Sequence, residues 1–238
     1  MMRLDRWLVT LGVGSRSQVQ KLIRQGAVTV NGLPVTDPSA ACDTGAALTL
    51  HRQPLDGRLT RHVMLHKPAG LLTAARDKKQ PTVMDLLPES YASIGCMPVG
   101  RLDKDTTGLL FLTTDGELNH RLLSPTRHVD KTYLAQVDGP LSEKEVAAFA
   151  EGLHLSDFDA KPALLEITGP ASGRVTVQEG KFHQVKRMFS AVGREVTALH
   201  RESFGSLRLD PTLPEGQWRE LTDEELRGLY ADAQMEAP

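Results

Sequence analysis

The spacing of the strand-like segments constrains the fold of this 238-residue chain more than any other feature of its sequence. Beyond residue 60, strand-like segments outnumber helical ones, and they lie at residues 61–66, 109–114, 131–138, 162–168, 174–178 and 195–199. Several connections between them are too short for the crossover helices that parallel strands require. Helical patterns lie at residues 116–124, 142–150, 183–192 and 223–230. Together, these strand-like and helical segments predict an α+β domain with a mixed, mostly antiparallel sheet and flanking helices.

The first 52 residues predict a separate, smaller unit. One amphipathic helix is indicated by apolar residues at positions i, i+3, i+4 and i+7, which are Leu4, Trp7, Leu8 and Leu11. Ser15 and Gln18 have the spacing of a capping box and predict the start of a second helix, which ends at Gly26. Short strands are expected at residues 27–30, 33–35 and 48–50, and residues 53–60 are expected to form a linker. A helix pair with a small hairpin is too small to be an enzyme, so we interpret it as an accessory, phosphate-binding module.

The formal net charge of -2 conceals an uneven distribution. Residues 1–30 and 174–208 each carry a net charge of +4, whereas residues 209–238 carry -6. Charges farther apart than a Debye length of ~8 Å are largely screened, so the acidic segment need not neutralise the basic ones in space. Two basic stretches favour a polyanionic partner, and solvated helix faces are the alternative.

The composition excludes several classes of protein. With 40% hydrophobic and 24% charged residues, the chain is not of a disordered type. No apolar run approaches the ~20 residues that span a bilayer, and residues 1–9 lack the apolar core of a signal peptide. Cys42 and Cys96 are far apart, which predicts neither a disulfide framework nor a cysteine–zinc site and fits a reducing cytoplasm. His62 and His66 share a strand face without a third ligand, so we expect no metal site.

The segment GRLDKDTTGLL at residues 100–110 concentrates two acids and two bases within five residues. Asp103 and Asp105 could be turn formers that bond their own backbone. Alternatively, one of them is a functional carboxylate that neighbouring bases keep ionised. A glycosidase with paired carboxylates is a weaker interpretation, because residues two apart in a loop need not converge on one bond.

The N-terminal segment RLDRWLVTLGVGSRSQVQKLIRQGAVTVNG resembles the S4 RNA-binding domain. In S4 domains a helix–loop–helix and a short sheet present basic residues to structured RNA. Arg16, Lys21 and Arg24 lie off the apolar stripe of the second helix and face outward. The resemblance implies that these three residues and Arg3 contact RNA.

The loop GRLDKDTTGLL resembles the catalytic loop of the RsuA/RluB/RluE/RluF family of pseudouridine synthases. Three other segments agree with this family in order and spacing: MLHKPAG at residues 64–70, KTYLAQV at 131–137 and EGKFHQVKRMFSAVG at 179–193. Together with the S4 segment, the resemblance covers nearly the whole chain. It implies an S4 module with its linker at residues 1–58, a pseudouridine synthase domain at residues 59–231 and a C-terminal tail at residues 232–238.

The resemblance implies that the chain isomerises a uridine to pseudouridine. The N1–C1′ bond is cut, the base turns and is rejoined through C5, without a redox step or net hydrolysis, so no cofactor is expected. Asp103 matches the catalytic aspartate, which either attacks C1′ or removes the 2′ proton, and Tyr133 matches the residue that stacks on the target base. The target must leave its stack, at a cost of a few kcal/mol. Arg101, beside the aspartate, would hold the flipped nucleotide or fill the space that it leaves.

The helix at residues 183–192 carries the expected basic partner of Asp103. At 3.6 residues per turn, Lys186 lies roughly 110° from the centre of the apolar stripe, and Arg187 roughly 150°. Lys186 is therefore on the flank, where its side chain can reach a carboxylate, and the family places it at the ion-pair position. Arg187 is expected to point toward solvent or RNA phosphate, and His183 and Gln184 are further candidate RNA contacts.

The segments DTTG at residues 105–108 and FHQVKR at residues 182–187 look most like the RsuA branch. That branch acts on small-subunit 16S rRNA, by resemblance at uridine 516. We therefore expect 16S rRNA as the partner, either as free RNA or within a small-subunit assembly intermediate. The large-subunit branches typically show NREVRR where this chain has FHQVKR, and Glu in place of Thr107. A large-subunit 23S rRNA synthase and a non-catalytic S4-type assembly factor are the alternatives. We expect cytoplasmic localisation, no membrane contact and no obligate protein partner.

Overall fold

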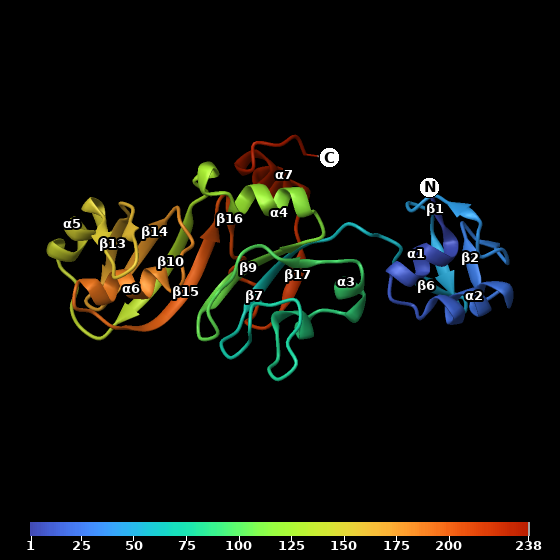
Figure 1. Ribbon diagram of the computed structural model, residues 1–238, viewed down its shortest axis with the longest axis horizontal. Coiled ribbons are helices and arrows are strands. Elements are labelled where there is room, and N and C mark those ends of the chain that lie inside the picture. The colour runs from blue at the N-terminus through green and yellow to red at the C-terminus, as the bar shows by residue number, and fades with distance from the viewer. Residues whose placement is uncertain (238) are drawn as a thin grey trace.

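Residues 1–55 fold into a small N-terminal unit at one end of an elongated molecule (Figure 1). The computed structural model describes residues 1–237. The helices are α1 (Leu4–Thr10) and α2 (Arg16–Arg24). A four-stranded sheet has the order β3 (Leu33–Pro34), β2 (Val28–Val30), β5 (Leu48–Leu50), β6 (Gln53–Leu55), and β1 (Met2–Arg3) pairs with β4 (Ala41–Cys42).

The core of the N-terminal unit forms as the helical periodicity predicts. Leu4, Trp7 and Leu8 of α1 are fully buried and pack with Val19 and Ile23 of α2. The capping box at the start of α2 is present, with Gln18 accepting from the backbone N–H of Ser15. One expectation for this unit is wrong: residues 53–55 are not part of a linker but form strand β6, which pairs with β5.

The large unit is built on a nine-stranded mixed sheet whose main path has the order β13-β14-β10-β15-β9-β7-β17. Its strands are β7 (His62–Lys67), β8 (Met97–Pro98), β9 (Thr107–Thr113), β10 (Lys131–Val137), β13 (Leu164–Gly169), β14 (Ser172–Val177), β15 (Val196–Phe204), β16 (Leu207–Arg208) and β17 (Trp218–Glu220). A separate hairpin joins β11 (Leu153–His154) to β12 (Asp159–Ala160). All pairs in the nine-stranded sheet are antiparallel except β9 with β15. The predicted mixed, mostly antiparallel α+β architecture is therefore confirmed.

Helices cover both faces of this sheet, which explains why β9 is apolar at consecutive positions. Leu110 and Leu112 face one core, whereas Leu109 and Phe111 face the other. The first face is covered by η1 (Val83–Leu86), α3 (Glu89–Ser93), α5 (Glu143–Glu151) and α6 (Gln184–Ala191). The second face is covered by α4 (Gly116–Leu123), followed by η2 (Pro125–Arg127), and by α7 (Asp223–Asp232), which lie together in Figure 1.

The parallel pair β9–β15 joins the two halves of the sheet at a single close approach. Only His200 with Thr107 and Arg201 with Gly108 are in register there. A Cβ on Gly108 would lie 2.3 Å from the carbonyl oxygen of Arg201, and the φ of Gly108 is +104°. Both facts require glycine at this position. Because the two strands run in the same direction, the segments that precede them lie at the same end of the sheet.

The acidic C-terminal segment is an integral part of the large unit. Arg219 of β17 forms ion pairs with Asp210 at 2.8 Å and with Glu225 of α7 at 2.7 Å. Helix α7 extends to Asp232, and the side chain of Ala233 is fully buried. The expected tail at residues 232–238 therefore begins within the fold, because α7 and the turn that follows it pack on α4 and the sheet.

Several bases of the 174–208 stretch have partners within the protein. Arg174 pairs with Glu202 at 2.7 Å, and Arg194 with Glu145 at 3.5 Å. Arg201 is 2% exposed, and its Nε donates to the carbonyl of Leu109 in β9. The charge count of the sequence therefore overstates the basic surface of this stretch.

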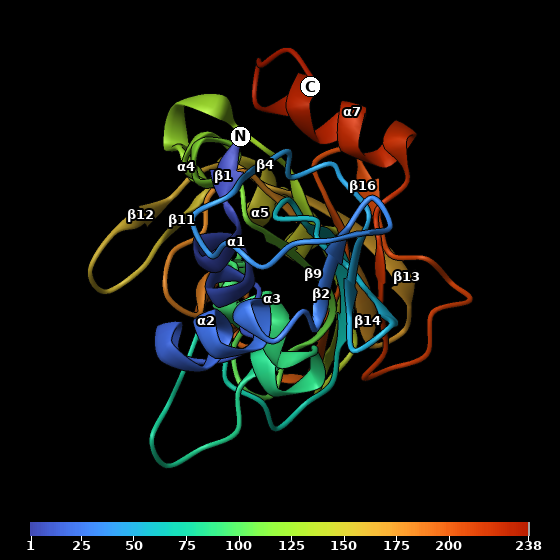
Figure 2. The ribbon, with the colours of Figure 1, turned by 90° about the vertical axis from the view of Figure 1, so that its right-hand side faces the viewer.

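A hydrogen bond to the N-terminal unit and two ion pairs to the large unit hold the linker between them. Trp7 of α1 donates through Nε1 to the carbonyl of Gly57. Arg58 and Arg61 each form an ion pair of 2.7 Å with Glu220 of β17. At the junction α3 lies beside α1 in both views (Figures 1 and 2), and a Cβ on Gly12 would contact Ser93. Within residues 1–237, no helix combines the length and the apolarity that crossing a bilayer takes.

Candidate active site

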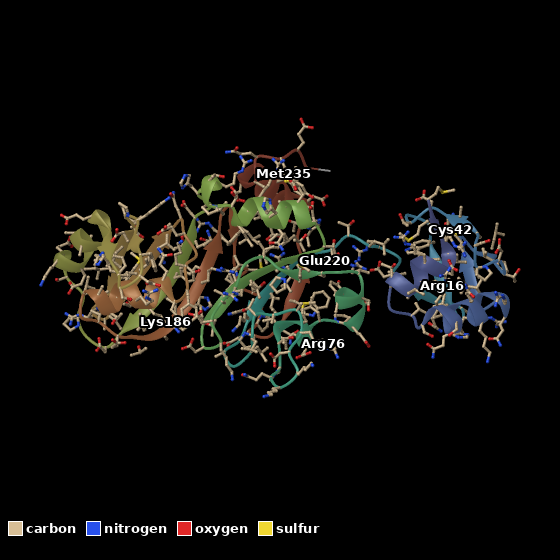
Figure 3. All side chains as sticks on the ribbon, in the orientation of Figure 1. Arg16, Cys42, Arg76, Lys186, Glu220 and Met235 are labelled. Atoms are coloured by element: carbon tan, nitrogen blue, oxygen red, sulfur yellow. The ribbon has the colours of Figure 1, made fainter. Side chains whose placement is uncertain are left out.

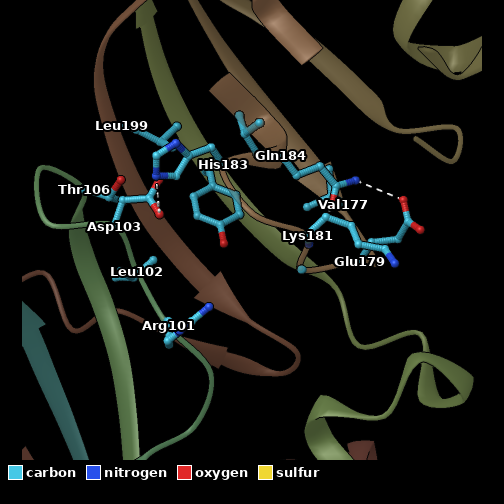
Figure 4. A pocket seen from close by; sticks show the side chains of 13 residues that line it. Arg101, Leu102, Asp103, Thr106, Val177, Glu179, Lys181, His183, Gln184 and Leu199 are labelled. Atoms are coloured by element: carbon cyan, nitrogen blue, oxygen red, sulfur yellow. Dashed lines mark hydrogen bonds and ion pairs between the residues drawn. The ribbon is translucent and has the colours of Figure 1, made fainter. Parts of the chain in front are cut away.

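A pocket opens at the end of the sheet where β9 and β15 begin (Figure 4). It combines the loop before β9, the strands β10, β14 and β15, and the turn that leads into α6. Its lining residues are Arg101, Leu102, Asp103, Thr106, Tyr133, Val177, Glu179, Gly180, Lys181, His183, Gln184, Val185 and Leu199. The parallel register of β9 and β15 thus brings together segments that are about 80 residues apart in the sequence.

Backbone hydrogen bonds fix the loop that carries Asp103. The hydroxyl of Thr73 accepts from the N–H of Leu102 at 3.2 Å and donates to the carbonyl of Leu102 at 2.8 Å. After Asp103, the N–H of Thr106 donates to the carbonyl of Asp103, which closes a turn. The carbonyl of Lys104 accepts from the N–H of Gly70 at 2.7 Å. The backbone on both sides of the carboxylate is therefore immobilised.

Lys67, at the end of β7, lies fully buried beneath this loop. Its ammonium donates to the carbonyls of Pro68, Lys104 and Thr106 at 2.9–3.3 Å. Burial lowers the pKa of Lys67 to about 8, although Asp105 and Asp103 oppose the shift. Lys67 was not among the site residues expected from the sequence, and its position in MLHKPAG, directly at the end of a strand, was the available signal.

Lys186 reaches from α6 to both acids of the loop. Its Nζ lies 2.6 Å from Oδ1 of Asp105 and 3.7 Å from Oδ2 of Asp103. The hydrogen bond from Lys186 is the main cause that lowers the pKa of Asp105. Lys186 was expected as the partner of Asp103, and the structure adds Asp105 as its shorter contact. Asp105 is 74% exposed at its side chain and Asp103 is 27% exposed, so Asp103 is the carboxylate that faces the pocket.

His183 lies against Asp103 on the other side. Its Nε2 is 3.5 Å from Oδ1 of Asp103 (Figure 4), and its ring stacks on that of Phe182 with centroids 3.7 Å apart. His183 has a φ of +50° directly before α6, a left-handed conformation that costs a non-glycine residue about 1–3 kcal/mol. The turn therefore holds the imidazole beside the carboxylate at some cost in backbone strain.

Tyr133 provides the aromatic wall of the pocket. It lies in the middle of β10, where it is in register with Arg201 of β15 and Val175 of β14. Only 9% of its surface is exposed, and the core residues of both neighbouring strands hold the ring in place. A rigid ring close to a carboxylate suits stacking on a planar base.

Two predicted RNA contacts on α6 have internal partners. Gln184 is 5% exposed; its amide accepts from the N–H of Lys181 and donates to Glu179, so it closes the turn rather than facing solvent. The guanidinium of Arg187 forms an ion pair with Asp157 and lies over the ring of Phe158 at 4.9 Å. The segment between β11 and β12 partly covers Arg187, whose side chain stays 25% exposed, and its contact with RNA remains a prediction.

The predicted S4 contacts lie away from the pocket. Arg3, Arg16, Lys21 and Arg24 are exposed in the N-terminal unit, and Figure 3 shows Arg16 and Lys186 in opposite parts of the molecule. Arg3 and Arg16 are positioned by the buried carboxylate of Asp5, at 2.9 and 3.8 Å. Arg101, in contrast, is exposed at the rim of the pocket beside Asp103.

Among residues 1–237 no group of three or more His, Cys, Asp and Glu side chains is arranged to hold a metal ion. His62 and His66 instead hydrogen-bond to the hydroxyl of Thr113 and the carbonyl of Leu213. The chemistry that the pocket itself offers is that of one partly exposed carboxylate beside a lysine, a histidine and a tyrosine ring. Such a carboxylate can act as a nucleophile or as a base.

Comparison with known proteins gives a consistent result. Residues 61–191 match the family described as RNA pseudouridylate synthase, and residues 2–48 match the S4 domain. The chain is 43% identical to an uncharacterized RNA pseudouridine synthase of Bacillus subtilis, over 94% of this chain and 97% of the relative. It is 43% identical to the ribosomal small subunit pseudouridine synthase A of Pseudomonas aeruginosa (94% and 99%) and 40% identical to that of Escherichia coli (94% and 98%). A crystal structure of a pseudouridylate synthase superposes with a TM-score of 0.69 at 38% identity, over 96% of this chain and 100% of that chain.

Proposed function

This chain belongs to the RNA pseudouridylate synthase family and has an S4 domain, and we propose that it converts one uridine of small-subunit 16S rRNA, uridine 516, to pseudouridine. Relatives at 40–43% identity over 94% of the chain are named small subunit pseudouridine synthases, which supports this substrate. The observation that carries the proposal is the placement of Asp103 on an immobilised loop, between Lys186 and His183, in a pocket walled by Tyr133.

In the proposed reaction, Asp103 acts on the ribose of a uridine that has left its stack. The carboxylate either adds to C1′ as the N1–C1′ bond breaks, or removes the 2′ proton as the uracil leaves. Both routes need the ionised form, since a protonated acid is neither a nucleophile nor a base. Lys186 lies 3.7 Å from this carboxylate and favours its charge electrostatically. After the base has turned, C5 bonds to C1′ as the bond between C1′ and Asp103 breaks on the first route, or as the 2′ proton returns on the second. C5 then releases its proton and N1 takes one up, so the nucleotide keeps its composition and only the C5 hydrogen passes to water.

Tyr133 would stack on the target uracil, and Arg101 at the rim would hold the flipped nucleotide. Arg3, Arg16, Lys21 and Arg24 would bind phosphates of the same RNA through the S4 domain. His183 and Gln184 both line the pocket. Nε2 of His183 is directed at Asp103, whereas the side-chain amide of Gln184 is directed at the backbone of Lys181. Gln184 and Arg187 would contribute by shaping the turn and the helix that present Lys186.

The proposal is tested by tritium release from C5-labelled uridine in 16S and 23S rRNA, assayed separately. The wild-type chain should release tritium from 16S rRNA, with one equivalent per molecule and pseudouridine at position 516. Asp103→Asn should abolish release. Asp105→Asn is the matched control, because Asp105 is 74% exposed and an exposed pair is worth about 0–1 kcal/mol, so release should fall less than about fivefold.

Each other outcome identifies a different function. Release from 23S rRNA alone would make the chain a large-subunit synthase. RNA binding without release from either rRNA would make it a non-catalytic S4-type factor. Equal tritium release by Asp103→Asn and the wild-type chain would mean that Asp103 has no role in the reaction.

A further inference from the structure

A second, larger cavity continues from the active-site pocket toward α4. This flanking groove has a volume of about 780 Å³. It shares with the pocket Arg101, Asp103, Glu179, Gly180, Lys181 and His183, so the two cavities adjoin along these residues. The remaining lining residues are Pro98, Gly100, Asn119, Leu123, Pro125, Lys131, Lys161, Gln178 and Phe182. A polymer with one residue in the pocket would continue into this groove.

The flanking groove carries the most exposed aromatic side chain of the described residues. Phe182 is 69% exposed, whereas every other large hydrophobic side chain of the large unit is less exposed. The ring is nevertheless held in one orientation, because it stacks on His183 at an interplanar angle of 20°. His183 in turn contacts Asp103. One face of Phe182 therefore continues a column that starts at the catalytic carboxylate, and the opposite face has no stacking partner in residues 1–237.

The charges of the flanking groove favour an anion. Four bases line it, namely Arg101, Lys131, Lys161 and Lys181, against two acids. One of the acids is Asp103, and the other, Glu179, already accepts from the N–H of Lys161 and from Gln184. Lys131 is buried among carbonyls, which leaves Lys161, Lys181 and Arg101 exposed at the surface of the groove.

We propose that the flanking groove binds the RNA strand next to the target uridine, with Phe182 stacking on the base of an adjacent nucleotide and Lys161 and Lys181 contacting its phosphates. The proposal rests on the proposed function, since it requires the target uridine in the pocket. Extruding the target removes one stacking partner from each neighbour, and an aromatic ring restores that interaction for any base. Exposed lysines beside the ring provide the phosphate contacts that accompany such stacking platforms.

The stacking is tested by a double-mutant cycle between protein and RNA. The substrate is the shortest 16S rRNA fragment from which the wild-type chain releases tritium. It is made intact or with an abasic site at either neighbour of the target. On intact RNA, Phe182→Leu should raise KM about 5- to 150-fold, the range for one base–aromatic stack, while kcat changes less than threefold. Phe182→Trp should keep a KM close to that of the wild-type chain.

On RNA that is abasic at the stacked neighbour, Phe182→Leu and the wild-type chain should have the same KM, because the interaction partner is already missing. Leu164→Ala is the control, since Leu164 is 57% exposed on β13 and does not line the groove. Lys161→Gln and Lys181→Gln should each reduce the salt dependence of binding, by about 0.7 in the slope of log K against log salt.

An unchanged KM for Phe182→Leu would overturn the proposal, as would a KM increase that persists on both abasic substrates. The second result would assign Phe182 a purely structural role. These failures are distinct from failure of the proposed function, because tritium release by the wild-type chain from intact RNA reports the function independently in the same assay.

Discussion

Gly108 is the position where a single added methyl group should separate the two halves of the active site. It lies in β9, opposite Arg201 of the parallel strand β15. In Gly108→Ala the new Cβ would lie 2.3, 2.6 and 2.9 Å from the carbonyl oxygen, nitrogen and carbonyl carbon of Arg201. These are backbone atoms, so a side-chain rotation cannot relieve the overlap, and β15 has to move by about 1 Å to reach ordinary contact.

The cost follows from three contributions. A non-glycine residue at a φ of +104° is strained by about 1–3 kcal/mol. Moving β15 disrupts the short parallel pairing, at about 1 kcal/mol for each backbone hydrogen bond. It also pulls the buried guanidinium of Arg201 from the carbonyl of Leu109, a charged hydrogen bond worth about 1.5–3 kcal/mol. Together these predict a loss of about 4–8 kcal/mol.

Thermal and urea unfolding followed by circular dichroism measure this loss. For a chain of this size, each 1 kcal/mol lowers Tm by about 2–4 °C, so the melting temperature should fall by about 8 °C or more. Gly116→Ala is the matched control, because nothing lies within 4 Å of its Cβ and it occupies the first position of α4. That substitution should leave stability unchanged or raise it by up to about 1 kcal/mol. If Gly108→Ala unfolds within about 1 kcal/mol of the wild-type chain, the close approach of β9 and β15 does not hold the sheet together.

Lys67→Met removes the ammonium that holds the catalytic loop, so tritium release should fall roughly tenfold or more, and equal release would refute the loop's dependence on it. In the wild-type chain, kcat/KM should decline as the pH rises past about 8, because burial lowers the pKa of Lys67 to about 8 and the neutral amine has one N–H fewer; a profile that is flat to pH 9.5 would contradict this. Arg187→Gln loses the pair with Asp157 and the contact with Phe158, and should lower stability by roughly 1–3 kcal/mol while KM for rRNA changes less than threefold. A large KM change without a stability change would instead make Arg187 an RNA contact. Deletion of residues 1–58 should weaken RNA binding and flatten its salt dependence, and an unchanged slope in a salt titration would argue against an RNA-binding role for the S4 domain.

Local signals predicted the elements whose information lies within a few residues. The capping box at Ser15 starts α2 as expected, because the side chain and the N–H group that it binds are within one turn. Short strands such as β6 and β17 were missed. Each has only three residues, and each exists because a distant strand, β5 or β7, offers it backbone partners.

Helix geometry predicted part of the site, and tertiary contacts decided the rest. The angle of Lys186 on α6 correctly placed its side chain within reach of the catalytic loop, since that angle depends only on the helix. The same reasoning could not predict the partners of Arg187, because Asp157 and Phe158 lie in another segment. Gln184 was expected as a candidate RNA contact, but its amide accepts from the N–H of Lys181 and closes the turn before α6. Lys67 was not predicted, because its position at the end of a strand in MLHKPAG does not by itself indicate that three carbonyls would surround its ammonium.

The clamped linker has a consequence for how the chain selects its substrate. Two RNA-binding surfaces joined covalently act as a bivalent ligand, and the second contact forms at an effective concentration that the connection between them sets. A loose tether would allow the active site to sample many uridines around the S4 anchor. Here Glu220 holds Arg58 and Arg61, and Trp7 holds Gly57, so the connection is short and stiff. A stiff connection restricts the active site to uridines at one distance from the RNA segment that the S4 domain binds. The linker thereby sets the distance, within the folded RNA, between the S4 contact and the target uridine.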